Sequence, residues 1–303
     1  MSGYLESQLI ILCLNVIYAY GIFLPAASGQ LNLGAAGFIT IGAYASAYFN
    51  MSGAPMYLAI PASMLFCAAI AFVIAFPILR TRGVYMVLAT FAFAEVVAGL
   101  IINLEFLGAA AGYPVESHAD FLVVVPVTIL VVLLCFFLMS TRLGLAMRSI
   151  HDDEAVATLF GVDVRLAKVA AFTIGAALMS LGGALYGHHY NYIETQSFNV
   201  LLSIYILLYV LLGGTQTAWG PLIGAAFFTI VPETLRQIAA SSGQEWIADT
   251  RFIFFGAIIV LMMVFRPEGL ITRTLIDRVA MPFAGGRGGP GGRSGPAPTA
   301  KIA

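Results

Sequence analysis

Long apolar runs separated by short polar breaks make up most of this chain. A helix needs about 20 mostly apolar residues to cross the hydrocarbon core of a bilayer. Charged residues are only 10% of the chain, against about 25% in soluble domains. We therefore predict an all-α, polytopic integral membrane protein with about nine transmembrane helices, in a range of roughly eight to ten. The predicted spans are residues 7–26, 31–50, 56–79, 84–106, 121–140, 169–188, 199–213, 219–238 and 251–266.

The Lys and Arg residues set the orientation of these spans. Loops on the cytoplasmic side of a membrane carry an excess of both. With nine spans and the N-terminus outside, 12 of the 14 basic residues fall on the cytoplasmic side, and only Arg236 and Arg251 fall outside. The first eight residues contain no Lys or Arg, so we expect no cleaved signal peptide.

Residues 141–168 are the most charged stretch of the chain. The chain has 14 basic and 15 acidic residues, and this stretch holds eight of them. Because it lies between two apolar runs, we expect it in water on the cytoplasmic side. We predict one short amphipathic helix there, with three consecutive acids in its first turn, where they suit the helix dipole. Val156, Leu159 and Phe160 then form one apolar stripe, and Gly161 ends the helix. Such a helix either lies on the bilayer surface or offers its stripe to a soluble partner.

Several polar residues fall at or within membrane depth. Glu95 is the deepest ionisable one, and such a residue is a functional hypothesis by default. It either lines a pathway and meets an amino group of the substrate, or is a protonated or hydrogen-bonded structural residue. For the neutral residues the alternative to a pathway is hydrogen bonding between helices. The candidate translocation-path residues are Gln30, Asn32, Thr90, Glu95, Gln216 and Thr217.

The second span is dense in Gly and Ala, which permit close packing between helices, and we predict an interruption near Gly37. Two glycine-containing turns, Gly29–Gly34 and Gly213–Pro221, are each followed nearby by a Gly–Ala–Ala run. Interrupted segments in matching halves often mark a transport pathway. The two turns are therefore candidates for related halves of one fold.

Other functions find little support in the sequence. A net charge of −1 argues against nucleic acid as a partner. The three cysteines all lie inside apolar runs, as core residues do. His188 and His189 are neighbours in a predicted outer loop and lack metal-ligand spacing, so we expect no metal site. No GxxxxGK[ST] phosphate-binding loop or Ser/His/Asp set is present, which indicates a chain that is not itself an enzyme.

We expect two regions: a transmembrane domain over residues 1–280, which includes the charged loop 141–168, and a cytoplasmic tail over 281–303. The tail is rich in Gly, Pro and Ala, a composition typical of disorder.

Four segments carry a resemblance to a known family. Together with the connecting spans they cover most of residues 10–270 and resemble the LivM-type permease subunits of bacterial branched-chain amino acid ABC importers. The segments are LNLGAAGFITIGAYASAY from Leu31, RTRGVYMVLATFAFAEVV from Arg80, TRLGLAMRSIHDDEAVATLFGVDVRLAKVAAF from Thr141, and SFNVLLSIYILLYVLLGGTQTAWGPLIGAAFFTIVPE from Ser197.

The resemblance implies a heteromeric importer in the bacterial inner membrane. The implied partners are a second, LivH-like permease chain, two cytoplasmic ATPases that bind the ATP and Mg, and a periplasmic substrate-binding protein. The implied substrates are leucine, isoleucine and valine, while relatives of the same fold carry urea, short amides or other small amino or carboxylic acids. An ion-driven secondary transporter with Glu95 as its ion site, or a membrane-embedded enzyme, are the alternatives from other classes.

The resemblance also implies a role for the central segment. In such importers a short cytoplasmic helix sits in a groove of the ATPase. Glu154–Ala157 with Gly161 is similar to the family's Glu-Ala-Ala…Gly coupling segment, with Val in place of the second Ala and Gly one residue later. The alternative is a solvated loop with ordinary helix caps. The candidate coupling residues are Arg148, Asp152, Asp153, Glu154, Ala155, Val156, Leu159, Phe160 and Gly161.

Overall fold

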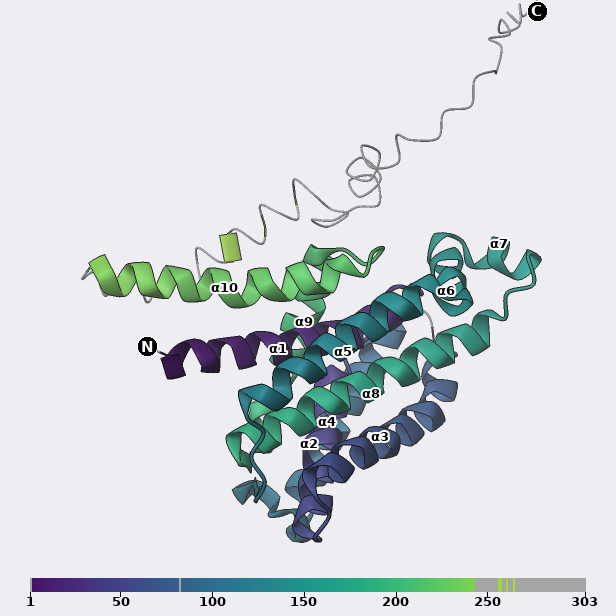
Figure 1. The fold of residues 1–303 in the computed structure, drawn as a ribbon. Helices are drawn as coiled ribbons and strands as arrows, with labels where there is room; N and C mark the ends of the chain where they lie inside the picture. The colour runs from purple at the N-terminus through teal and green to yellow at the C-terminus, as the bar shows by residue number, and fades with distance from the viewer. Residues whose placement is uncertain (1, 82, 243–255, 258–259, 261–263, 265–303) are drawn as a thin grey trace, which may run out of the picture.

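A computed structural model describes residues 2–81, 83–242, 256–257, 260 and 264. The predicted tail and most of the ninth predicted span, 251–266, lie outside these residues. The helices are arranged as Figure 1 shows. Their bounds are α1 Ser2–Ala26, α2 Ala35–Met51, α3 Met56–Ile78, α4 Val84–Ile102, α5 Phe121–Ser140, α6 Arg142–Asp152, α7 Glu154–Leu159, α8 Val164–Tyr190, α9 Val200–Gly213 and α10 Trp219–Ser242.

Eight of the nine predicted spans are helices within the described residues, which confirms the all-α class. Six helical segments there are long and apolar enough to cross a membrane, so the chain is a multi-pass membrane protein. These six are α1, α3, α4, α5, α8 and the segment Thr195–Gly213, which joins a 3-10 turn to α9.

The second span differs from its prediction. Helix α2 begins at Ala35 rather than at residue 31, and it runs unbroken through Gly37. A Cβ added to Gly37 would lie 3.0 Å from the Cα of Ala94 in α4. Gly37 therefore serves close packing between helices rather than a break, and the irregular stretch is the loop before α2. The fourth span also ends early, at Ile102.

Helix α8 is the centre of the bundle, packed along α1, α2 and α3. Glycines allow this close contact: a Cβ on Gly183 would lie 2.1 Å from the backbone oxygen of Ile39 in α2. The most apolar windows of α1 and α8 are each 72% buried, against 22% for α5 and 28% for α4. Helices α4 and α5 therefore turn most of their apolar side chains outward, as expected of lipid-facing helices.

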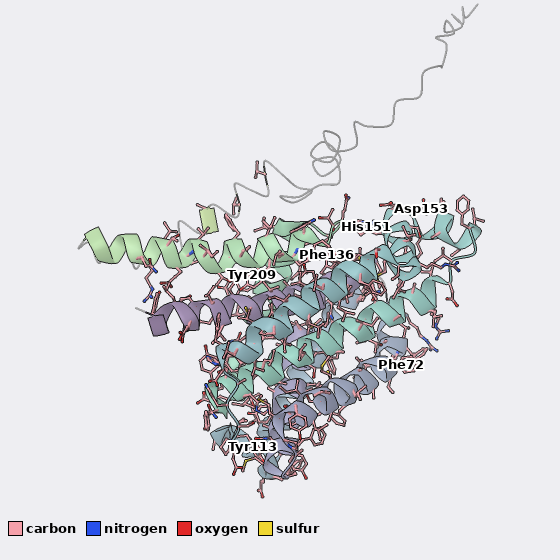
Figure 2. The ribbon with its side chains drawn as sticks, in the orientation of Figure 1. Phe72, Tyr113, Phe136, His151, Asp153 and Tyr209 are labelled. Carbon is pink, nitrogen blue, oxygen red and sulfur yellow. The ribbon has the colours of Figure 1, made fainter. Side chains whose placement is uncertain are left out.

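The bundle has two ends of different construction. At the end we call outer, strands β1 (Tyr113–Pro114) and β2 (Tyr192–Ile193) pair antiparallel, with Tyr113 opposite Ile193. At the opposite end, which we call inner, stand α6 and α7 (Figure 1). Figure 2 labels Tyr113 at the outer end and Asp153 at the inner end. Five described basic residues lie at the inner end, as expected for the cytoplasmic side: Arg80, Arg142, Arg148, Arg165 and Lys168.

His188 and His189 lie in the last turn of α8, which ends at Tyr190. The prediction that they belong to an outer loop is therefore wrong. His188 is buried, and its ring joins two segments: Nε2 hydrogen-bonds Ser46 Oγ of α2 at 2.8 Å, and Nδ1 hydrogen-bonds Ser117 Oγ at 2.7 Å. The ring is part of the packing that closes the outer end. Sequence spacing could not predict these partners, because Ser46 is 142 positions and Ser117 is 71 positions from His188.

Candidate functional site

The charged segment folds into two helices, α6 and α7, where one was predicted. Asp153 separates them with an extended backbone, φ −159°. Its Oδ1 accepts hydrogen bonds from the N–H groups of Ala155, at 2.8 Å, and Val156, at 3.0 Å, as an N-cap side chain does. An N-cap residue must leave helical geometry, so α6 has to end at Asp152. Two acids rather than three therefore stand at the start of α7.

The end of α7 is as predicted. Gly161 has φ +79°, a left-handed conformation that glycine adopts without strain. Its N–H donates to the Thr158 oxygen at 3.0 Å, and the Val162 N–H donates to the Ala157 oxygen at 3.2 Å. These bonds satisfy carbonyls that the helix end would otherwise leave unpaired.

The predicted apolar stripe of α7 lies open on the surface. Val156, Leu159 and Phe160 are 45%, 86% and 84% exposed. The other side of α7 is anchored, because Ala157 is 2% exposed in a small buried cluster. That cluster contains Ile150 of α6 and Val164 and Ala167 of α8. The helix is thus fixed on one side and presents large apolar side chains on the other.

Charged groups fasten α7 to the first turns of α8. Lys168 Nζ lies 2.7 Å from Glu154 Oε2. Asp163 caps α8 by accepting from the Leu166 N–H at 2.9 Å. Lys168 belongs to α8 rather than to the loop in which the sequence placed it, and its pairing with Glu154 was missed. Glu154 and Lys168 are 14 residues apart and lie on different helices, so helical spacing in the sequence could not reveal their contact.

The other candidate coupling residues surround this helix. Asp152 is exposed at the end of α6, Ala155 is exposed in the first turn of α7, and Arg148 is half-buried on α6. The chain therefore brings all nine predicted coupling residues to the inner end, within α6, α7 and the turn that follows.

Three of the candidate path residues hold the irregular loop before α2. Gln30 Nε2 donates to Ser28 Oγ at 2.7 Å and to the Lys168 backbone oxygen at 3.1 Å. Asn32 Oδ1 accepts from the Gly34 N–H at 2.7 Å. Thr90 Oγ1 of α4 accepts from the Leu33 N–H at 3.0 Å. All three side chains are buried.

The remaining path candidates lie elsewhere. Gln216 and Thr217 are in the turn after α9, which Tyr20 of α1 ties down by donating to the Ala218 oxygen at 2.8 Å. Glu95 is exposed near the middle of α4, on a face turned away from the buried Thr90. The six residues therefore occupy three places and do not form one cluster. Within the described ranges, no group of three or more His, Cys, Asp or Glu side chains is placed to hold a metal ion.

Comparison with known proteins gives a consistent picture. The family described as "Branched-chain amino acid transport system / permease component" matches residues 4–263. The high-affinity branched-chain amino acid transport system permease protein LivM of Escherichia coli is 28% identical over 82% of this chain and 65% of its own length. LivM of Salmonella typhimurium is 29% identical over the same shares. The permease protein LivH of Escherichia coli is 25% identical over 48% of this chain and 45% of its own length.

The chain spans about 65% of the length of the two LivM relatives. No solved structure matches it.

Proposed function

The chain belongs to the family of branched-chain amino acid transport system permease components, and from that premise we propose that it is a permease subunit of a bacterial ATP-driven importer. It sits in the inner membrane beside a second, LivH-like permease chain. Two cytoplasmic ATPases bind and hydrolyse the ATP with Mg, so this chain needs no cofactor, and a periplasmic binding protein delivers the substrate. The names of the LivM and LivH relatives support branched-chain amino acids as that substrate.

The exposed stripe of α7 carries this proposal. Leu159 and Phe160 are both more than 80% exposed, on a helix whose opposite side is buried and capped. A partner that covers exposed apolar surface gains about 25 cal/mol of binding free energy for each Å² removed from water. A rigid apolar projection at the cytoplasmic end therefore fits insertion into a groove of the ATPase.

The contacts of α7 suggest how the ATPase cycle reaches the membrane spans. A push on α7 is passed to α8 through the Glu154–Lys168 ion pair and through the buried contacts of Ala157. Helix α8 packs along α1, α2 and α3, so its tilt would move the centre of the bundle. The mechanism is alternating access, driven by closure of the ATPase dimer.

A double substitution tests this coupling. Glu154→Lys with Phe160→Asp removes the ion pair and puts a charge on the stripe, and we expect it to abolish uptake while the chain stays inserted in the membrane. Thr158→Asp is the matched control, because Thr158 is exposed on the same short helix but lies outside the stripe. Radiolabelled uptake and co-purification of the ATPase are measured together. Normal uptake by the double variant would contradict the proposal.

We further propose that Glu95 faces the second permease chain and the translocation path between the two. An ionisable group near the middle of a span costs a few kcal/mol in lipid, so an outward Glu95 calls for a protein or water neighbour. Glu95→Gln should lower uptake several-fold, whereas Glu105→Gln, in the outer loop after α4, should leave it unchanged. Equal uptake by the two variants would remove Glu95 from the path.

The substrate itself is assigned by a separate measurement. Titrating the partner binding protein with leucine, isoleucine, valine, urea and short amides would separate the branched-chain proposal from transport of other small molecules. Tight binding of urea alone would overturn it.

A further inference from the structure

Helices α3 and α4 form an open seam on the surface of the bundle. They make few contacts with each other, whereas each packs against α2. Two hollows lie along this seam: a cavity of about 480 Å³ at the inner end and a groove of about 670 Å³ further toward the outer end. Both use residues of α3 and α4 as walls, and their linings differ in character.

The inner cavity is basic. Arg80 enters it from the turn after α3, and Arg165 and Lys168 enter from α8. Among the described residues that line it, Glu154 is the single acid, and it is already paired with Lys168. The structure gives Arg80 and Arg165 no carboxylate partner within the part of the chain it describes. The described residues that line the cavity therefore carry an excess of two positive charges.

The position of Arg165 is supported by an aromatic contact. Its guanidinium carbon lies 5.3 Å from the centre of the Phe76 ring of α3, a cation–π geometry. Phe76, Leu79 and Met86 belong to the apolar part of the lining, with Val164 and Val169. A cation held at the rim of an apolar wall suits a ligand that is anionic at one end.

The outer groove is apolar throughout. Its walls are aliphatic and aromatic side chains with almost no polar surface. Further toward the outer end, Ile74 and Ile70 of α3 and Phe93 and Val97 of α4 are among the residues that line the groove. Two arginines therefore line the hollow nearer the inner end of the seam, and apolar side chains line the hollow nearer the outer end.

We propose that the seam between α3 and α4 is a binding site for an anionic phospholipid, with its phosphate headgroup between Arg80 and Arg165 and an acyl chain in the outer groove. Arginine suits this role because its planar fork matches phosphate oxygens. Basic pockets between transmembrane helices on the cytoplasmic side are where anionic headgroups bind. The site is independent of the transported substrate.

The proposed headgroup site lies next to α7, so a bound lipid would affect the position of that helix. The headgroup cavity is also lined by Glu154 of α7 and by Gln30, whose amide donates to the Lys168 backbone oxygen. A bound headgroup would neutralise the two arginines next to the Glu154–Lys168 pair that fastens α7 to α8. The lipid therefore stabilises the position of α7 from which the ATPase acts.

Photo-crosslinking in the assembled transporter tests the proposal. A benzophenone amino acid is placed at Ile74, in the groove, or at Leu133, which is 61% exposed on α5. The complex is reconstituted in vesicles of equimolar phosphatidylethanolamine and phosphatidylglycerol. We expect the ratio of phosphatidylglycerol to phosphatidylethanolamine crosslinked at Ile74 to rise by about 30-fold, the factor that two arginines near the membrane surface provide, and the ratio at Leu133 to match the bulk.

The arginines are then tested directly. Arg80→Gln with Arg165→Gln should return the crosslinked lipid at Ile74 to the bulk composition. Arg142→Gln is the control, because Arg142 is exposed at the same end but does not line the cavity. Enrichment that survives the double substitution would overturn the proposal.

Two further outcomes would assign the seam to another ligand. Absence of enrichment at Ile74, together with binding of inorganic phosphate that Arg80→Gln with Arg165→Gln abolishes, would show that the cavity binds free phosphate rather than lipid. Crosslinking of Ile74 to another polypeptide of the complex would show that the groove is a subunit interface. Either result overturns the lipid site.

Discussion

The two ends of this bundle are both built from short segments, but they differ in which side chains they bury. At the outer end, β1 pairs with β2, and His188 is buried between Ser46 and Ser117. At the inner end, α7 is just as firmly capped, yet Leu159 and Phe160 remain exposed. The outer end buries the polar ring of His188 through hydrogen bonds within the chain, whereas α7 at the inner end leaves its apolar stripe exposed, as the proposed ATPase contact requires. An ordered helix that keeps an apolar stripe exposed at the inner end fits the role proposed for α7 as the contact with the ATPase.

Two glycines with positive φ offer the sharpest test of this contrast. Gly112 at the outer end has φ +83°, and a Cβ there would lie 2.6 Å from the Ile193 oxygen. Gly161 at the inner end has φ +79° and open space around it. Gly112→Ala should lower stability by about 3 kcal/mol, from backbone strain and overpacking together. Gly161→Ala should cost about 1 kcal/mol, from strain alone. Unfolding in detergent, followed by circular dichroism, measures both, and equal costs would remove the distinction between a closed and an open end.

The buried histidine tests closure of the outer end with a smaller effect. His188→Ala leaves the hydroxyls of Ser46 and Ser117 without their shared partner, so the free energy of unfolding should fall by about 1–3 kcal/mol. The control is Glu116→Ala, because Glu116 is exposed in the same loop as Ser117 and surface changes are usually within about 0.5 kcal/mol. Thermal unfolding of the purified protein reports both values. A loss no larger than that of the control would mean that His188 does not hold the outer end together.

The ion pair at the inner end should give the smallest change in stability. The Lys168 and Glu154 side chains are 20% and 44% exposed, so solvent screens them and either single charge reversal should cost less than about 1 kcal/mol. Uptake should respond more strongly, because the pair links α7 to α8. The exchange Glu154→Lys with Lys168→Glu restores opposite charges and should recover uptake lost in Lys168→Glu alone. Failure to recover would show that the pair does not transmit motion.

Local pattern was enough for much of this fold. Apolar runs located eight helices within the described residues, because a membrane span must satisfy its backbone within itself and is therefore written in consecutive residues. The stripe of Val156, Leu159 and Phe160 and the stop at Gly161 were visible for the same reason: helical spacing and the conformational freedom of glycine are properties of neighbours in sequence. The excess of basic residues predicts which end is cytoplasmic, and that orientation stays a prediction.

Only the tertiary structure decided which residues meet. It divided the charged segment at Asp153, paired Glu154 with Lys168, buried His188 and turned Glu95 outward. It also set Arg80 and Arg165 around one cavity, although 85 positions separate them in the chain. Such outcomes depend on packing between helices distant in sequence, where small residues such as Gly183 fix how closely two backbones approach. A single sequence encodes the faces of its helices, and the face that each neighbour covers is settled only when the helices pack.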